Sequence, residues 1–369
     1  MCISLNVTTY SKENEAWPPC REKGKQPSCS ISIFSKAKVA ETIRTCLSVL
    51  VMADDSITLQ QFIEPQFIKI TEGFPGAEGP VFDKCGNFYM VAPEVKTNGN
   101  FAGQVVRIDL DTCKSTVICE PNIDGFGGIP AGCQCDKNNV IWIADMRLGI
   151  LTVSPSGQFN QLCKEDIDGN TMQGCNDCCF DYDGNLWVTA PAGKIAPHPY
   201  TRSSKEAFGS VYCVTNQQKV IKVDTGYLIS NGIAVHHSSD GKPKKLIVAE
   251  TRTQSLWVYD ILGPGAVGKK TLWGKLPKCP SVDGVPTGPD GMDFDEAGNL
   301  IVAHIRSGYL EVFGPEGHRP HTRIKCPFIK PSNVHFQPGT STVYVTEHEF
   351  DGLWKFQWLR KGQPQYCEL

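Results

Sequence analysis

The sequence has no apolar run of the length that a membrane span needs, which is about 18 residues. It also has no excess of positive charge, because 36 Lys and Arg residues are balanced by 39 Asp and Glu residues, with a net charge of -3. Nucleic-acid backbones attract clustered basic side chains, and here the basic residues are scattered. We therefore expect a soluble protein that binds neither membrane nor nucleic acid.

Helix signals are scarce beyond Ile63, whereas cysteine is abundant, with 17 residues. Secreted disulfide scaffolds are usually shorter than about 100 residues and have even cysteine counts. Cys133 and Cys135 also occupy alternate positions of one apolar strand pattern. We therefore expect reduced, buried thiols in a cytoplasmic protein. A zinc site at the Cys175 to Cys179 cluster is disfavoured, because no second ligand pair follows at finger spacing.

Residues 1–61 differ from the rest, being rich in Ser and Lys without any turn rhythm. Such composition predicts a poorly ordered N-terminal extension, with residues 62–369 forming the folded catalytic domain. The stretch CLSVLVMA, from Cys46 to Ala53, resembles a short internal signal peptide. Secretion therefore stays open as an alternative to a cytoplasmic location.

One sequence pattern recurs after Ile63. It consists of a predicted strand, a turn of the D-x-G-N kind, and a second strand rich in aromatic and β-branched residues. Its copies begin at Gly76, Pro130, Gly174, Ser230, Gly288 and Lys330. Each copy is followed by another hairpin, which makes about four short strands per repeat. This pattern predicts an all-β fold, a six-bladed β-propeller, rather than a β-sandwich. Early and late strands, near residues 66–70 and 353–358, can complete one blade together.

Equivalent positions of the six copies should meet at the propeller axis, because the innermost strand of each blade lines the channel. These positions are Glu78, Ala131, Asn176, Asn231, Asp290 and Ser332. Two carboxylates and two carboxamides among them are oxygen donors that suit a hard divalent cation, best calcium. The sequence therefore predicts a calcium site on the axis.

Asp293 follows Asp290 by three residues, so in a regular strand it should point to the opposite side. The equivalent position in the last copy is His335. The two side chains fit either an ion pair in the core or a second, structural cation site. The spacing does not separate these alternatives.

The chain from about Phe62 to Glu368 resembles the squid-type diisopropylfluorophosphatase family. Shared runs include PGAEGPVFDK, GGIPAGCQCD, MQGCNDC, GNLWVTAPAG, NGIAV, LIVAET, PDGMDFD and TEHE. Members of that family are calcium-dependent six-bladed propellers that hydrolyse organophosphorus fluoridates. The fold is shared with gluconolactonase, senescence-marker and paraoxonase groups, so the fold alone does not choose the substrate.

The resemblance implies a role for each matching residue. It implies a catalytic calcium held by Glu78, Asn176, Asn231 and Asp290, and a structural calcium held by Asp293, His335 and the main-chain oxygen of Val334. His348 matches a histidine proposed as a general base, although a histidine between two glutamates is also typical of a hydrogen-bonded structural group. The pocket-lining positions implied by the resemblance are Glu94, Met146, Tyr200, Arg202 and Ser332.

Two features depart from the family pattern. Where the family reads A-N-W-G-S, this chain reads AHIRS from Ala303 to Ser307, so Ile305 replaces an indole of the pocket wall. The loop LPKCPSVDGVPTG, residues 276–288, is also longer than expected. We expect both changes to leave metal binding intact and to alter the leaving-group preference.

These observations predict a monomeric hydrolase that cleaves the P–F bond of small organophosphorus substrates. Asp290 would serve either as the nucleophile or as the base that orients a metal-bound water. Two alternatives stay open. One is a calcium-dependent lactonase, since the same ion can polarise a lactone carbonyl. The other is a non-catalytic calcium-binding propeller.

Overall fold

The computed structural model describes residues 49–53, 56–172, 174–191, 207–280, 282 and 284–369. These segments are built almost entirely from β-strands, with two short 3-10 helices, Thr251–Thr253 and Tyr366–Glu368. No helix in the described segments is long and apolar enough to cross a membrane. The predicted all-β fold is confirmed.

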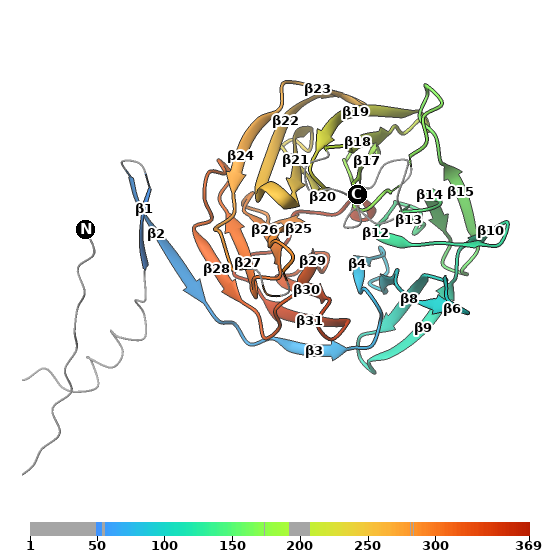
Figure 1. The fold of residues 1–369 in the computed structure, drawn as a ribbon, viewed down its shortest axis with the longest axis horizontal. Coiled ribbons are helices and arrows are strands. Elements are labelled where there is room, and N and C mark those ends of the chain that lie inside the picture. The colour runs from blue at the N-terminus through green and yellow to red at the C-terminus, as the bar shows by residue number, and fades with distance from the viewer. Residues whose placement is uncertain (1–48, 54–55, 173, 192–206, 281, 283) are drawn as a thin grey trace, which may run out of the picture. The chain divides into compact units, whose positions relative to one another are not determined.

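Six antiparallel blades are arranged in a ring (Figure 1). Blade 1 consists of β4 (Glu78–Phe82), β5 (Phe88–Ala92), β8 (Gln104–Asp109) and β9 (Lys114–Cys119). Blade 2 consists of β12 (Pro130–Cys135), β13 (Ile141–Asp145), β14 (Gly149–Val153) and β15 (Phe159–Cys163). Blade 3 consists of β16 (Cys178–Phe180), β17 (Leu186–Ala190), β18 (Gly209–Val214) and β19 (Val220–Tyr227).

The next two blades follow the same order along the chain. Blade 4 consists of β20 (Ser230–His237), β21 (Pro243–Glu250), β22 (Ser255–Gly263) and β24 (Thr271–Lys275). Blade 5 consists of β25 (Gly288–Phe294), β26 (Leu300–Ile305), β27 (Tyr309–Phe313) and β28 (Thr322–Lys325). Five further strands of two residues each lie outside the four-stranded pattern. They are β6 (Lys96–Thr97), which pairs with β7 (Asn100–Phe101), β10 (Asn122–Ile123), which pairs with β11 (Phe126–Gly127), and β23 (Ala266–Val267), which pairs with β22.

Blade 6 closes the ring by joining the two ends of the propeller. It consists of β29 (Pro331–Phe336), β30 (Thr342–Glu347), β31 (Gly352–Gln357) and the early strand β3 (Ile68–Thr71). The predicted pairing of an early strand with a late one is therefore confirmed. The first strands of neighbouring blades contact one another around the whole ring, from β4 through β12, β16, β20, β25 and β29 back to β4.

Strand pairing begins before the propeller itself. β2 (Ser56–Ile63) runs parallel to β28, with Gln61 opposite Thr322, and β1 (Val49–Ala53) pairs with β2. The predicted boundary between the N-terminal extension and the catalytic domain, at residues 61 and 62, falls inside β2. The division of the chain into these two domains stays a prediction. Residues 1–48 of the predicted extension lie outside the described residues.

The recurring D-x-G-N turn has a structural explanation in its aspartate. Asp181 Oδ1 accepts a hydrogen bond from the main-chain nitrogen of Asn185 at 2.9 Å, and its Oδ2 accepts one from Trp187 Nε1 at 2.9 Å. Asp295 does the same with the main-chain nitrogen of Asn299 and with Trp358 Nε1. These carboxylates satisfy donors that the tight turn leaves unpaired, so the repeat marks blade structure rather than a metal site.

Apolar side chains of adjacent blades pack into the spaces between the sheets. Cysteines take part in this packing: Cys133 and Cys135 lie in the cluster between blades 1 and 2, and Cys178 lies in the cluster between blades 2 and 3. Every described cysteine is free, and most are buried. This agrees with the expectation of reduced core thiols.

Candidate metal centre and active site

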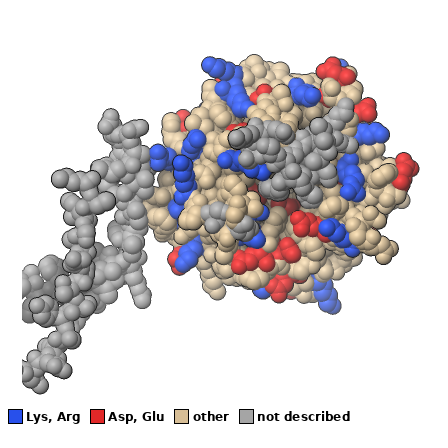
Figure 2. All heavy atoms as spheres, viewed as in Figure 1, with Lys and Arg blue, Asp and Glu red and all other residues tan. Residues whose placement is uncertain are grey.

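The four predicted axial oxygen donors come together at one pocket. Glu78, Asn176, Asn231 and Asp290 all line a pocket with a cavity volume of about 170 Å³. They come from the inner edges of blades 1, 3, 4 and 5, at or just before the first strand of each blade. On the face shown in Figure 2, acidic side chains gather close to the centre of the ring.

The strands that carry the axial positions are irregular at the same place. The pairing register of β4, β12, β20, β25 and β29 shifts at or next to the axial residue, as between Pro289 and Met292 in β25. Such bulges re-aim a side chain and change the alternation of the strand. The expectation that Asp290 and Asp293 point to opposite sides assumed a regular strand, and it does not apply here. Asp290 lines the first pocket and Asp293 lines a second one in the same channel.

Glycines allow the inner strands to approach one another closely. A Cβ atom at Gly79 would lie 2.8 Å from the main-chain oxygen of Ala131, and one at Gly132 would lie 2.8 Å from that of Asn176. Gly232 meets the backbone of Asp290 in the same way. Because these glycines directly follow axial positions, each blade places its axial residue against the backbone of the next.

The electrostatics of the pocket fit a cation. Asp290 is only 5% exposed. Burial raises the pKa of Asp290 well above its usual value, and the nearby Glu78 carboxylate raises it further. Two neighbouring carboxylates in a buried site stay charged only when a positive charge compensates them.

The amide of Asn231 is held in an orientation that suits this site. Its Nδ2 donates a hydrogen bond to Thr251 Oγ1 at 3.1 Å, and Thr251 Oγ1 in turn donates to the main-chain oxygen of Pro289 at 2.9 Å. The carbonyl oxygen is therefore left for the pocket. Within the described residues no group of three or more His, Cys, Asp and Glu side chains has a metal-binding arrangement. Half of the donors here are carboxamides, and an all-oxygen set of this kind suits calcium rather than zinc.

His348 borders the same pocket next to Glu78. Its Nε2 lies 3.2 Å from Glu78 Oε1, although the N–H is not aligned with that oxygen as in a hydrogen bond. Burial lowers the pKa of His348, but the carboxylates of Glu78, Asp290 and Glu94 outweigh this effect and raise it to about 9. The ring is therefore a cation at neutral pH in this arrangement.

The predicted pocket-lining residues have different outcomes. Glu94, Met146 and Ile305 line the pocket. Ser332 is fully buried and does not line the pocket; its hydroxyl donates to the main-chain oxygen of Ala77 at 2.9 Å and is hydrogen-bonded to Thr346 Oγ1 at 3.0 Å. Tyr200 and Arg202 lie outside the described residues.

Asp293, Val334 and His335 line the second pocket, which has a cavity volume of about 40 Å³. Asp293 Oδ2 lies 3.6 Å from His335 Nδ1 and accepts a hydrogen bond from the main-chain nitrogen of Phe336 at 2.9 Å. Burial lowers the pKa of His335 to about 4 and raises that of Asp293 to about 7. A charged ion pair is therefore disfavoured, whereas a neutral imidazole beside a buried carboxyl group is a combination that can hold a cation.

Two residues between the pockets were missed by the sequence analysis. Asn333 Nδ2 lies 3.5 Å from Glu78 Oε2. Asp177 is buried, and burial together with the Glu78 charge raises its pKa to about 7. Both residues directly follow an axial position. At this following position, four of the six copies of the repeat have glycine, whereas these two have Asp177 and Asn333. Aligning the six copies at this position could have identified both residues.

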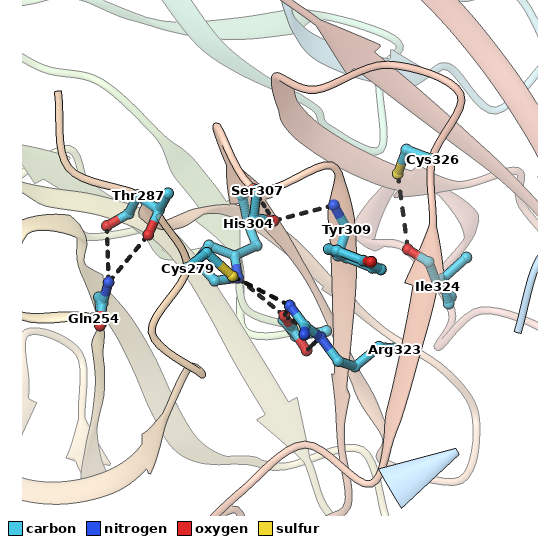
Figure 3. A network of polar contacts seen from close by, with 10 residues as sticks. Gln254, Cys279, Thr287, His304, Ser307, Tyr309, Arg323, Ile324 and Cys326 are labelled. Carbon is cyan, nitrogen blue, oxygen red and sulfur yellow. Dashed lines mark hydrogen bonds and ion pairs between the residues drawn. The ribbon is translucent and has the colours of Figure 1, made fainter. Parts of the chain in front are cut away.

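A buried polar network supports the pocket wall behind Ile305 (Figure 3). Glu311 Oε1 contacts His304 Nδ1 at 2.9 Å and Arg323 Nη2 at 2.7 Å. Arg323 Nη2 also donates to Cys279 Sγ at 3.4 Å. The longer loop before β25 is thereby attached to blade 5, next to the strand that carries Ile305.

Comparisons with known proteins agree with this geometry. The family model of the SMP-30/gluconolactonase/LRE-like region matches residues 77–349. The diisopropyl-fluorophosphatase of Loligo vulgaris is 58% identical over 307 residues, which are 83% of this chain and 96% of that protein. A gluconolactonase of Zymomonas mobilis is 24% identical over 246 residues, 65% of this chain and 67% of that protein.

Among solved structures, the calcium-binding protein regucalcin from Agrobacterium tumefaciens superimposes with a TM-score of 0.64 at 19% identity. The match covers 84% of this chain and all of that one, and at this identity it supports the fold alone. The family match and the squid enzyme carry the assignment. The chain therefore belongs to the SMP-30/gluconolactonase/LRE-like family, in which it is similar to the squid-type diisopropyl-fluorophosphatase.

Proposed function

We propose that this protein is a calcium-dependent hydrolase that cleaves the P–F bond of organophosphorus compounds. The name of its relative in Loligo vulgaris, diisopropyl-fluorophosphatase, supports the P–F bond as the bond that is cleaved. The observation that carries the proposal is the meeting of Glu78, Asn176, Asn231 and Asp290 at one pocket. These four residues would hold the catalytic calcium through oxygen atoms alone. The 58% identity to the diisopropyl-fluorophosphatase of Loligo vulgaris supports the choice of substrate class.

Calcium bound at this site would polarise the phosphoryl oxygen and stabilise the charge that develops on it. Asp290 then serves either as the nucleophile that attacks phosphorus or as the base that orients a water molecule. Met146 and Ile305 supply an apolar wall that excludes water from the reacting centre. Glu78 and Asp290 neutralise the cation, so the loaded site carries no excess charge from these three groups.

We assign His348 a positioning role rather than that of a general base. The contact of 3.2 Å between His348 Nε2 and Glu78 Oε1 suits a group that holds this carboxylate in place. Replacing His348 with Gln should then change calcium affinity and leave kcat for fluoride release at saturating calcium near that of the wild type. A large loss of kcat at saturating calcium would instead indicate a general base.

We further propose that Asp293, His335 and the main-chain oxygen of Val334 hold a second, structural calcium, with water completing its shell. The support is the neutral His335 beside a buried carboxyl group, and the lack of any hydrogen-bond partner for His335 Nε2 among the described residues. His335→Gln should lower the melting temperature in calcium more than in EDTA.

The proposed activity is tested by fluoride release from diisopropyl fluorophosphate. The proposal expects release that disappears with EDTA and returns with calcium. Aliphatic lactones are the comparison substrates, and turnover of lactones without fluoride release would transfer the assignment to the lactonase class. Calcium binding without fluoride release or lactone turnover would support the second alternative, a non-catalytic calcium-binding propeller. A single turnover in oxygen-18 water then separates the two roles of Asp290. Direct attack displaces fluoride and forms an Asp290–phosphorus ester; water that cleaves this ester at the acyl carbon puts the label in the carboxylate and leaves an unlabelled Asp290 oxygen in the product, whereas attack by an oriented water puts the label in the product alone.

A further inference from the structure

Arg306 adds a positive charge to the wall of the candidate active site. It directly follows Ile305 at the end of β26, and both residues line the same pocket as Glu78 and Asp290. Among the described lining residues, Arg306 is the only arginine or lysine, and guanidinium does not deprotonate in proteins. The proposed hydrolysis of a neutral fluoridate does not call for this charge.

The hairpin that carries Arg306 is held in a defined conformation. Ser307 Oγ donates to the main-chain oxygen of His304 at 2.7 Å and accepts from the main-chain nitrogen of Tyr309 at 3.0 Å. Arg306 has a φ of 64°, a left-handed conformation that residues other than glycine rarely adopt. Glu311 of β27 contacts His304 of β26 and Arg323 of β28, so the three strands are linked next to Arg306. Figure 3 shows His304 and Arg323 in this network. The backbone that carries Arg306 is therefore fixed at the pocket.

Arg306 borders the space in which a substrate would lie, because it lines the same pocket as Glu78 and Asp290. A guanidinium also offers paired N–H donors that match carboxylate and phosphoryl oxygens.

Resting on the proposed function of this site, we propose that Arg306 is a specificity residue that favours substrates bearing an oxyanion next to the ester that is cleaved. The substrate class is an ester with an apolar body, to contact Ile129, Met146 and Ile305, and one carboxylate or phosphoryl oxyanion. A neutral triester fits the same pocket but does not use the guanidinium.

The test compares two ligands that differ in charge and have no leaving group that the enzyme can release readily. They are methyl phenylphosphonate, a monoanion, and dimethyl phenylphosphonate, which is neutral. Calorimetry on the calcium-loaded protein measures both affinities for the wild type, Arg306→Gln and Arg306→Lys. We expect Arg306→Gln to weaken binding of the monoanion by about 10- to 100-fold, the range of a charge-assisted hydrogen bond, and to change the neutral ligand less than about 3-fold. Arg306→Lys should retain part of the preference.

Arg147→Gln is the matched control, because Arg147 occupies the corresponding hairpin of blade 2. There it donates to the main-chain oxygen of Gly127 at 3.0 Å and lies over the Phe101 ring, and it does not line the pocket. Its variant should bind both ligands like the wild type. Equal binding of the monoanion by the wild type and Arg306→Gln would overturn the proposal.

A turnover arm separates this inference from the proposed function. Ethyl 4-nitrophenyl phosphate, an anionic diester, and diethyl 4-nitrophenyl phosphate, a neutral triester, share one leaving group. Arg306→Gln should lower the ratio of their kcat/KM values by about 10-fold or more. Calcium-dependent fluoride release with an unchanged ratio and unchanged binding would overturn the inference alone. Loss of fluoride release in the wild type would overturn the proposed function, and the calorimetric comparison would still decide whether Arg306 binds oxyanions.

Discussion

A Cβ atom at Gly232 would lie within 3.0 Å of the main-chain carbonyl oxygen of Asp290, which belongs to the next blade. Asn231 directly precedes this glycine, and both Asn231 and Asp290 line the candidate calcium pocket. The absence of a side chain at one position thus sets how closely two proposed ligands from different blades approach each other. Backbone contact, rather than side-chain packing, defines this part of the site.

Gly232→Ala should therefore separate β20 from β25. The added methyl group has no room against the Asp290 backbone, so we expect a loss of stability of about 1–3 kcal/mol, as for an overpacked core. Calcium affinity should fall by at least about 10-fold, because the ligands move apart. Urea unfolding and calorimetry measure the two effects. Gly263→Ala is the control, since a Cβ there meets no atom within 4 Å; equal calcium binding by the two variants would contradict the prediction.

Asp290→Asn should remove both functions that we assign to this carboxylate. The change keeps the size of the side chain but deletes one of the two charges that neutralise the cation and removes the nucleophile or base. We expect kcat for fluoride release to fall by about 100-fold or more, together with weaker calcium binding. The control is Asp136→Asn, which makes the same charge change at a turn of blade 2. Near-normal hydrolysis by Asp290→Asn would refute the assignment.

Acid should destabilise the folded protein through His237. Its ring is stacked on Tyr182 with centroids 3.5 Å apart, and its Nε2 accepts a hydrogen bond from the main-chain nitrogen of Tyr182 at 3.1 Å. Burial lowers the pKa of His237 from 6.5 to about 4. Between these two values the unfolded chain binds the proton and the folded chain does not. The free energy of unfolding therefore falls as the pH drops through this window.

The size of this effect is up to about 3 kcal/mol, which is lost once the pH is below 4. Urea unfolding at several pH values from 7 to 4 measures it as the difference between wild type and His237→Gln. The variant should show a shallower loss of stability in acid, while His335 is present in both proteins and contributes equally. Parallel curves for the two proteins would exclude His237 as the source.

Glu311→Gln should destabilise the pocket wall. Glu311 is fully buried and is the carboxylate shared by His304 and Arg323. Removing its charge leaves the partly buried Arg323 guanidinium without its counter-ion, which costs about 3–5 kcal/mol when a buried pair is broken. Thermal and urea unfolding measure the loss. Glu311→Gln combined with Arg323→Met should recover part of it, and a double variant no more stable than the single one would argue against a paired network.

The blade repeat shows how far local patterning reaches. Asp83, Asp136, Asp181 and Asp295 recur with a glycine or asparagine turn, and each caps the turn of its own hairpin. Because these contacts join residues within about six positions, the repeat predicted the six blades correctly. Ser332 occupies one of the predicted axial positions, but its hydroxyl bonds to Ala77 and Thr346 and does not line the pocket. Occupying an axial position of the repeat therefore did not decide which way the Ser332 side chain points.

The sequence by itself determined the propeller, the closure by an early strand and the four oxygen donors at the axis, because all of these follow from the order of short strands and turns. Only the tertiary structure decided that β25 bulges between Asp290 and Asp293, that Asp177 and Asn333 lie beside Glu78, and that Arg306 faces the pocket. The physical reason is that strand alternation is a local property. Bulges, close backbone contacts and the burial of charges arise only when blades far apart in the chain pack around one channel.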